Sequence, residues 1–167
     1  ESWGAAGFSF CNGWCGMQRM NACRMEKGCR HFGHDITSED HVLEAGLGFA
    51  VKTDKPDFIG RDAVLRKRET GLEQRLVQFK LTDPEPLLYH NEPVLRDGEV
   101  VGYLSSGGYG HHLGAAIGMG YVPCAQPGEK VADMLASTYE IDVMGTRVKA
   151  EAQLKPFYDP TSERVKA

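Results

Sequence analysis

The segment from residue 24 to residue 63 places charged residues and glycines among apolar residues without a helical or strand period. It contains Arg24-Met-Glu-Lys-Gly, His31-Phe-Gly-His-Asp-Ile, Glu44-Ala-Gly-Leu-Gly-Phe and Phe58-Ile-Gly-Arg-Asp-Ala. Residues of these types, so placed, lower the propensity for both helix and strand. A segment that only built a core would rarely have this composition, so we expect it to specify something besides packing.

Arg24 is the residue of this segment best suited to bind an anion. In a helix predicted over residues 17–27, Met17, Met20 and Cys23 share one face. Arg24 projects within about 20° of Met17 on the same wheel, so a guanidinium lies on the apolar side. Such an arginine can form a partly buried ion pair or extend its stem along apolar surface. It can equally be a fixed cation that faces a cleft and binds a carboxylate ligand. The residues leave both interpretations open.

Cysteine and histidine are the residues here that could bind a metal. The five cysteines are Cys11, Cys15, Cys23, Cys29 and Cys124. Their spacing lacks the paired Cys-x2-Cys knuckles of structural zinc sites, so we interpret them as reduced, small buried hydrophobes. His31 and His34 flank a loop and are interpreted as exposed or hydrogen-bonded. His111 and His112 are expected on a strand, where adjacent side chains point to opposite faces.

Residues from about 73 to 155 predict a series of short strands with no helices between them. Apolar residues alternate with polar ones at several places, and Asp97-Gly98 is typical of a type I′ hairpin turn. The residues predicted to face inward are Val77, Phe79, Val143, Val148 and Leu154. Such strands indicate an antiparallel sandwich or a small barrel. Residues 1–70 mix helix and loop, with a second helix expected over residues 61–69 and a solvated face at residues 66–68.

The composition is that of an ordinary globular protein, with 41% hydrophobic and 25% charged residues among 167. A net charge of −4 gives no reason to expect nucleic acid or an anionic membrane as a partner. No apolar run is long enough to span a bilayer, and no export segment is visible at the start.

Several ordered motifs resemble the glycine-cleavage aminomethyltransferase (T-protein) family. Those of the first half are Arg24-Met-Glu-Lys-Gly, Phe32-Gly-His-Asp-Ile, Glu44-Ala-Gly-Leu and Phe58-Ile-Gly-Arg. Those of the second half are Gly102-Tyr-Leu-Ser-Ser-Gly-Gly-Tyr109, Ile117-Gly-Met-Gly-Tyr-Val122 and Leu154-Lys-Pro-Phe-Tyr-Asp-Pro160. The resemblance covers residues 20–167, whereas residues 1–19 do not match. It is strongest to the C-terminal, folate-binding half of sarcosine and dimethylglycine dehydrogenases.

The resemblance implies an α+β, mainly β fold. A C-terminal antiparallel β-barrel over residues 71–167 would follow residues 1–70, the incomplete end of a folate-binding domain. It implies one-carbon transfer to tetrahydrofolate, with Arg24, Glu44 and Tyr109 as cofactor-binding candidates and a small amine as substrate. The location implied is the bacterial cytoplasm or the mitochondrial matrix.

The same resemblance shows what this sequence lacks. The family's catalytic aspartate and its Gly-Tyr-Thr-Gly-Glu motif do not occur, and no flavin-binding Gly-x-Gly-x-x-Gly opens the chain. FAD is therefore expected only in an N-terminal half outside this sequence, and we expect no activity from the chain alone. Its partners would be that half or another subunit. The alternative is a non-catalytic barrel that serves as a docking or structural module.

Overall fold

The computed structural model describes residues 14–166 and is built around a closed six-stranded barrel. The strands are β1 (Gln74–Leu81), β2 (Pro93–Arg96), β3 (Glu99–Gly110), β4 (Ala115–Pro123), β5 (Tyr139–Val143) and β6 (Thr146–Gln153). They follow the order β1-β4-β3-β2-β5-β6, and every neighbouring pair is antiparallel. β1 pairs with β6 to close the barrel, with Phe79 opposite Ala152. Closure gives every strand a hydrogen-bonded neighbour on each side.

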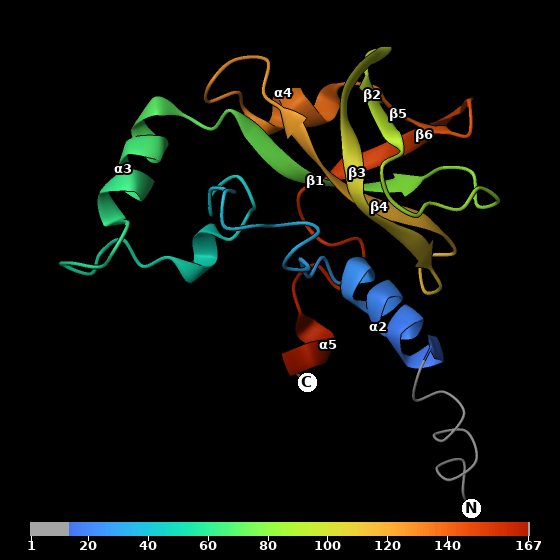
Figure 1. Ribbon diagram of the computed structural model, residues 1–167, viewed down its shortest axis with the longest axis horizontal. Coiled ribbons are helices and arrows are strands. Elements are labelled where there is room, and N and C mark those ends of the chain that lie inside the picture. Colours follow the sequence, from blue (N-terminus) through green and yellow to red (C-terminus); the bar gives the residue numbers. More distant parts are fainter. Residues whose placement is uncertain (1–13, 167) are drawn as a thin grey trace, which may run out of the picture.

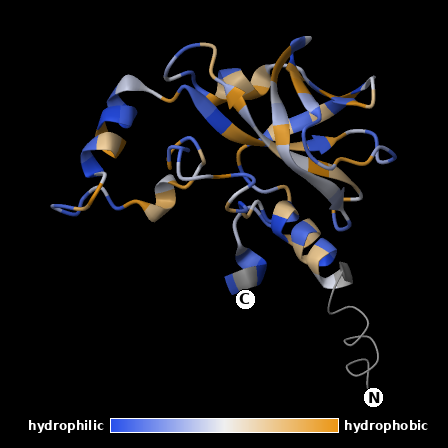
Figure 2. Ribbon diagram, viewed as in Figure 1, coloured by the Kyte–Doolittle hydropathy of each residue, from blue (hydrophilic) through white to orange (hydrophobic). Residues whose placement is uncertain are grey.

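The helices lie outside this barrel (Figure 1). They are α2 (Trp14–Glu26), the short 3-10 helix η1 (Gly48–Ala50), α3 (Arg61–Thr70), α4 (Val131–Ala136) and α5 (Glu163–Lys166). α2 packs against β3 and β4, whereas α3 extends away from the barrel and is largely hydrophilic (Figure 2). No helix within residues 14–166 is long and apolar enough to cross a membrane.

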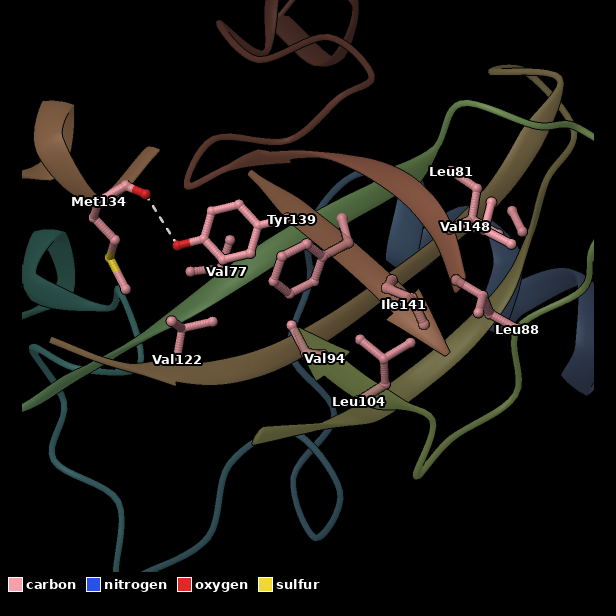
Figure 3. Packing of buried hydrophobic residues seen from close by; sticks show 12 residues of the cluster. Val77, Leu81, Leu88, Val94, Leu104, Val122, Met134, Tyr139, Ile141 and Val148 are labelled. Carbon is pink, nitrogen blue, oxygen red and sulfur yellow. Dashed lines mark hydrogen bonds between the residues drawn. The ribbon is translucent and has the colours of Figure 1, made fainter. Parts of the chain in front are cut away.

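The barrel interior forms the main core (Figure 3). Its largest buried side chains include Phe79, Leu81, Leu104, Met134 and Ile141. The buried Tyr139 hydroxyl donates a hydrogen bond of 3.0 Å to the Met134 carbonyl, so its polar atom is satisfied within the apolar interior.

The predicted antiparallel barrel and its strands are confirmed. Val77, Phe79 and Val148 are buried in the core, while Val143 and Leu154 are partly buried against it. The predicted hairpin turn joins β2 to β3, where the φ angles of Asp97 and Gly98 are 53° and 90°. Both residues therefore have the positive φ angles that a type I′ turn requires.

The expectation of no helix between the strands was wrong. The short helix α4 lies between β4 and β5, and its Met134 is fully buried in the barrel core. α4 has six residues and buries only Met134, so its sequence is too short to show a helical period of apolar residues from which the helix could be predicted.

A second apolar cluster fixes the C-terminal turn of α2 to the outside of the barrel. It consists of Met25, Leu76, Ile117 and Met119. Gln78, on the outer face of β1, is buried beneath this turn, and its Nε2 donates to the Met25 carbonyl at 2.9 Å. The position of Arg24, one residue before Met25, therefore depends on the barrel.

Both predicted helices are present, but their surroundings differ from expectation. The expected apolar face of α2 is open, since Met17 and Met20 are 68% and 64% exposed. Only the last turn of α2 is docked, so its earlier turns have no barrel surface beneath them. On α3, Lys67 does not belong to a solvated face, because it pairs with Glu44 and Glu73.

Candidate functional site

An open cleft of about 380 Å³ lies between α2, the loop that follows it and strand β3. The residues that line it are Met17, Gln18, Met20, Asn21, Arg24, His31, His34, Tyr89, His90, Ser105, Ser106 and Gly107. The exposed methionines of α2 thus form an apolar wall of this cleft. A cleft with apolar walls and a few convergent polar groups is the usual form of a small-molecule site.

Arg24 is held in this cleft by contacts from three parts of the chain. Its Nη1 forms an ion pair with Asp35 and also donates to the Cys29 carbonyl at 3.3 Å. Its Nε donates to Asn21 Oδ1 at 2.8 Å, and its Nη2 donates to Ser106 Oγ at 2.8 Å. These bonds fix the plane of the guanidinium and leave its side chain 16% exposed.

Asp35 is the buried partner of Arg24, with a fully buried side chain. Besides the guanidinium, it accepts hydrogen bonds from the backbone N–H of His31 at 2.8 Å and from Ser105 Oγ at 2.6 Å. Burial alone would raise the pKa of this carboxyl group, but the hydrogen bonds and the charge of Arg24 together hold it below its ordinary value. Asp35 is therefore ionised at neutral pH and balances the charge of Arg24.

A β-bulge in β3 brings two successive serines to this ion pair. Adjacent side chains on a regular strand point to opposite faces. The register between β3 and β4 shifts between Leu104 and Ser106, so Ser105 is the extra residue of the bulge. Ser105 reaches Asp35, and Ser106, the next residue, reaches Arg24. Re-aiming a side chain in this way is a common role of bulges next to binding sites.

Gly107 allows the segment at residues 88–90 to close the far side of the cleft. A Cβ atom at this position would lie 2.6 Å from the backbone nitrogen of Tyr89 and 2.7 Å from its carbonyl oxygen. No side chain fits such an approach, so the glycine is required where the two backbones meet.

Of the three residues predicted to bind a cofactor, Arg24 lines the cleft, whereas Glu44 and Tyr109 do not. Glu44 is buried and accepts from Lys67 Nζ and from the Glu73 backbone N–H, both at 3.0 Å. Burial raises the pKa of Glu44, but the contacts from Lys67 and Glu73 more than offset this and lower it overall. Tyr109 is half-buried on β3, with its ring edge against His111.

The sequence did not single out Asp35, Ser105 or Ser106 as site residues. Each lies inside a quoted motif, Phe-Gly-His-Asp-Ile or Leu-Ser-Ser-Gly-Gly. Asp35 and Ser105 are 70 residues apart in the chain, and Arg24 and Ser106 are 82 residues apart. No short spacing in the sequence therefore predicts that these residues meet.

The other candidate ligands also differ in part from expectation. Cys23 and Cys29 are exposed, so their interpretation as buried hydrophobes was wrong. Cys11 and the side chain of Cys15 lie outside the described residues. Within the described chain, no group of three or more His, Cys, Asp or Glu side chains could hold a metal ion. His111 and His112 lie in the turn after β3 rather than on a strand.

Two family profiles match the chain. One, described as the glycine cleavage T-protein C-terminal barrel domain, covers residues 74–159, just over half of the sequence. The other, described as the GCVT N-terminal domain, covers residues 4–55. The chain belongs to the glycine cleavage T-protein family. The second match begins well before residue 20, so the expectation that residues 1–19 fall outside the resemblance was wrong.

Individual relatives agree with this assignment. The chain is 40% identical over 152 residues to 4-methylaminobutanoate oxidase (formaldehyde-forming) of Paenarthrobacter nicotinovorans, covering 90% of the chain and 18% of that protein. It is 35% identical over 153 residues to mitochondrial sarcosine dehydrogenase of Homo sapiens, covering 90% and 17%. It is 42% identical over 118 residues to an aminomethyltransferase of Halothermothrix orenii, covering 70% and 33%.

A solved structure shares the fold. The glycine cleavage system aminomethyltransferase T from Bartonella henselae superposes with a TM-score of 0.70 at 23% identity. The match covers 84% of this chain and 38% of that one. The chain thus spans between about a sixth and two fifths of the lengths of these four proteins.

Proposed function

We propose that the chain is the C-terminal part of a tetrahydrofolate-dependent aminomethyltransferase-like protein and supplies one side of a folate site. The observation that supports this most strongly is the cleft beside the barrel, in which a fixed Arg24 lies next to an apolar wall. Met17, Met20 and Tyr89 give surface for a flat ring system, and Arg24 retains a donor for a polar group. These residues fit a folate, which combines both features.

In this proposal, the chain acts by positioning rather than by covalent catalysis. Bound tetrahydrofolate would supply the nitrogen atoms that accept a one-carbon unit from a small amine. Arg24 would orient the folate by a charge-assisted hydrogen bond, and the methionines of α2 would exclude water from its ring face. For Glu44 and Tyr109, a role in cofactor binding stays a prediction, because neither residue lines this cleft.

The remaining parts of the activity are assigned to regions outside this sequence. We propose that the chain alone transfers no aminomethyl group and oxidises no amine, because the family's catalytic aspartate and the flavin-binding region are not among its residues. Its partners would be those regions, either on the same polypeptide or on another subunit. The relatives include bacterial proteins and a mitochondrial one, so we propose the bacterial cytoplasm or the mitochondrial matrix as its location.

Calorimetric titration with folinic acid tests this proposal. Arg24→Ala should weaken binding by about 1.5–3 kcal/mol, the cost of a lost hydrogen bond to a charged group. Arg24→Lys should recover only part of this, because an ammonium cannot reproduce the planar guanidinium. Arg19→Ala is the matched control, since Arg19 lies on the same helix but does not line the cleft. Unchanged affinity in Arg24→Ala would refute the proposal, and absence of binding by the wild type would favour the structural module.

A further inference from the structure

The charge of Arg24 is already balanced before any ligand arrives. Arg24 is the only Lys, Arg, Asp or Glu among the residues that line the cleft in the described part of the chain. Its partner Asp35 lies directly behind it with a fully buried side chain. The ion pair itself therefore has no net charge.

The guanidinium also lacks the two parallel donors that a carboxylate needs. An arginine has five N–H donors. The bonds to Asn21, Asp35, Cys29 and Ser106 occupy one at Nε, two at Nη1 and one at Nη2. Within residues 14–166, a single N–H on Nη2 therefore has no acceptor. A bidentate contact to a carboxylate requires two neighbouring free donors, so it cannot form here.

We propose that the Arg24 end of the cleft binds a neutral carbonyl oxygen, such as that of an aryl amide, in preference to a carboxylate, and that Asp35 sets this preference. A carbonyl oxygen needs one donor and meets no repulsion from Asp35. A carboxylate would bring a second negative charge toward a buried one, and close like charges are unfavourable at low dielectric. This inference rests on the proposed function in placing the ligand in this cleft, and it differs from the alternative, left open by the sequence, that Arg24 binds a carboxylate ligand.

Two probes of the same shape and different charge test the inference. 4-Aminobenzamide and 4-aminobenzoate can be titrated separately into the ¹⁵N-labelled chain of 167 residues at pH 8, with binding followed by amide chemical shifts around the cleft. In the wild type, the amide should bind roughly three- to tenfold more tightly, a difference of about 0.7–1.4 kcal/mol. In Asp35→Asn the order should reverse, because Arg24 then carries an unbalanced positive charge.

Asp40→Asn is the matched control, because it removes one negative charge five positions further along the chain, from a residue that does not line the cleft. It should leave the preference for the amide unchanged. Tighter binding of the benzoate by the wild type, the same preference in Asp35→Asn, or no shifts with either probe would overturn the inference. The wild-type ranking needs no variant, so the inference stays testable if Asp35→Asn does not fold. If the amide binds at the cleft but folinic acid does not, the proposed function fails while this inference stands.

Discussion

Separate alanine substitutions of Arg24 and Asp35 should destabilise the fold unequally. The Asp35 side chain is fully buried, whereas that of Arg24 is 16% exposed at the edge of the cleft. Arg24→Ala strands a buried carboxylate, for which about 3–5 kcal/mol is the usual cost. The Ser105 hydroxyl and the His31 N–H still bind that carboxylate, so we expect a value near the lower end, about 3 kcal/mol.

Asp35→Ala should cost less, about 1–2 kcal/mol, the cost of leaving the Ser105 hydroxyl and the His31 N–H without their acceptor. The remaining guanidinium can turn toward the water in the open cleft, so its charge need not stay desolvated. The double variant should lose less stability than the two single losses added together, because neither charge is then left without a partner. The difference measures the coupling of the pair, for which about 1–3 kcal/mol is expected between contacting residues.

Urea unfolding of the four proteins measures these free energies. The pKa of Asp35 is held below its ordinary value, so its contribution to stability is complete above the unfolded pKa of about 3.9 and is lost as the pH falls through the folded pKa. The stability gap between wild type and Arg24→Ala should therefore narrow below about pH 4. Equal losses in the two single variants, with additive losses in the double variant, would show that the ion pair does not govern stability.

Two further predictions concern the walls of the cleft and the support of α3. Gly107→Ala should lower the free energy of unfolding by about 1–3 kcal/mol and weaken folinic acid binding, because its Cβ would collide with the backbone of Tyr89. Gly108→Ala is the control, since its Cβ would lie 3.5 Å or more from the Met25 side chain. Thermal melts that rank the two variants equally would contradict this. Glu44→Gln should lower stability by about 1–3 kcal/mol, because Glu44 is buried and bound to Lys67. The pKa of Glu44 is lowered and that of Lys67 is raised, so this stabilisation is complete near pH 7. In urea unfolding across pH, the gap to wild type should narrow as the pH falls through the folded pKa of Glu44 and again as it rises through the folded pKa of Lys67.

The strands could be predicted because their information is local. The alternation around Val77 and Phe79 and the turn residues Asp97 and Gly98 each specify structure within a few positions. Closure of the barrel pairs β1 with β6, about 70 residues later, and only the family resemblance distinguished a barrel from a sandwich. Long-range pairing depends on register across the whole sheet, which no short window of sequence contains.

The site was only half predictable, and Arg24 shows why. The helical wheel correctly placed its guanidinium on the same side as Met17, and both residues line one cleft. It could not show that this side stays open, because that depends on where α2 meets the barrel. Nor could it identify the acid that pairs with Arg24, since Asp35 becomes a partner only through the fold of the loop after α2.

The barrel therefore does more than support the cleft. Ser105 and Ser106 belong to β3, and the bulge that directs them to Asp35 and Arg24 exists only when β3 is paired with β4. Met25 is held by residues of β1 and β4, and this contact positions the neighbouring Arg24 relative to β3. An isolated helix and loop over residues 14–47 would contain both Arg24 and Asp35 but not their serine partners, so the contact that holds Nη2 would be lost. The orientation that leaves Arg24 one donor without an acceptor among residues 14–166 thus depends on the closed barrel as well as on the motif that carries the arginine.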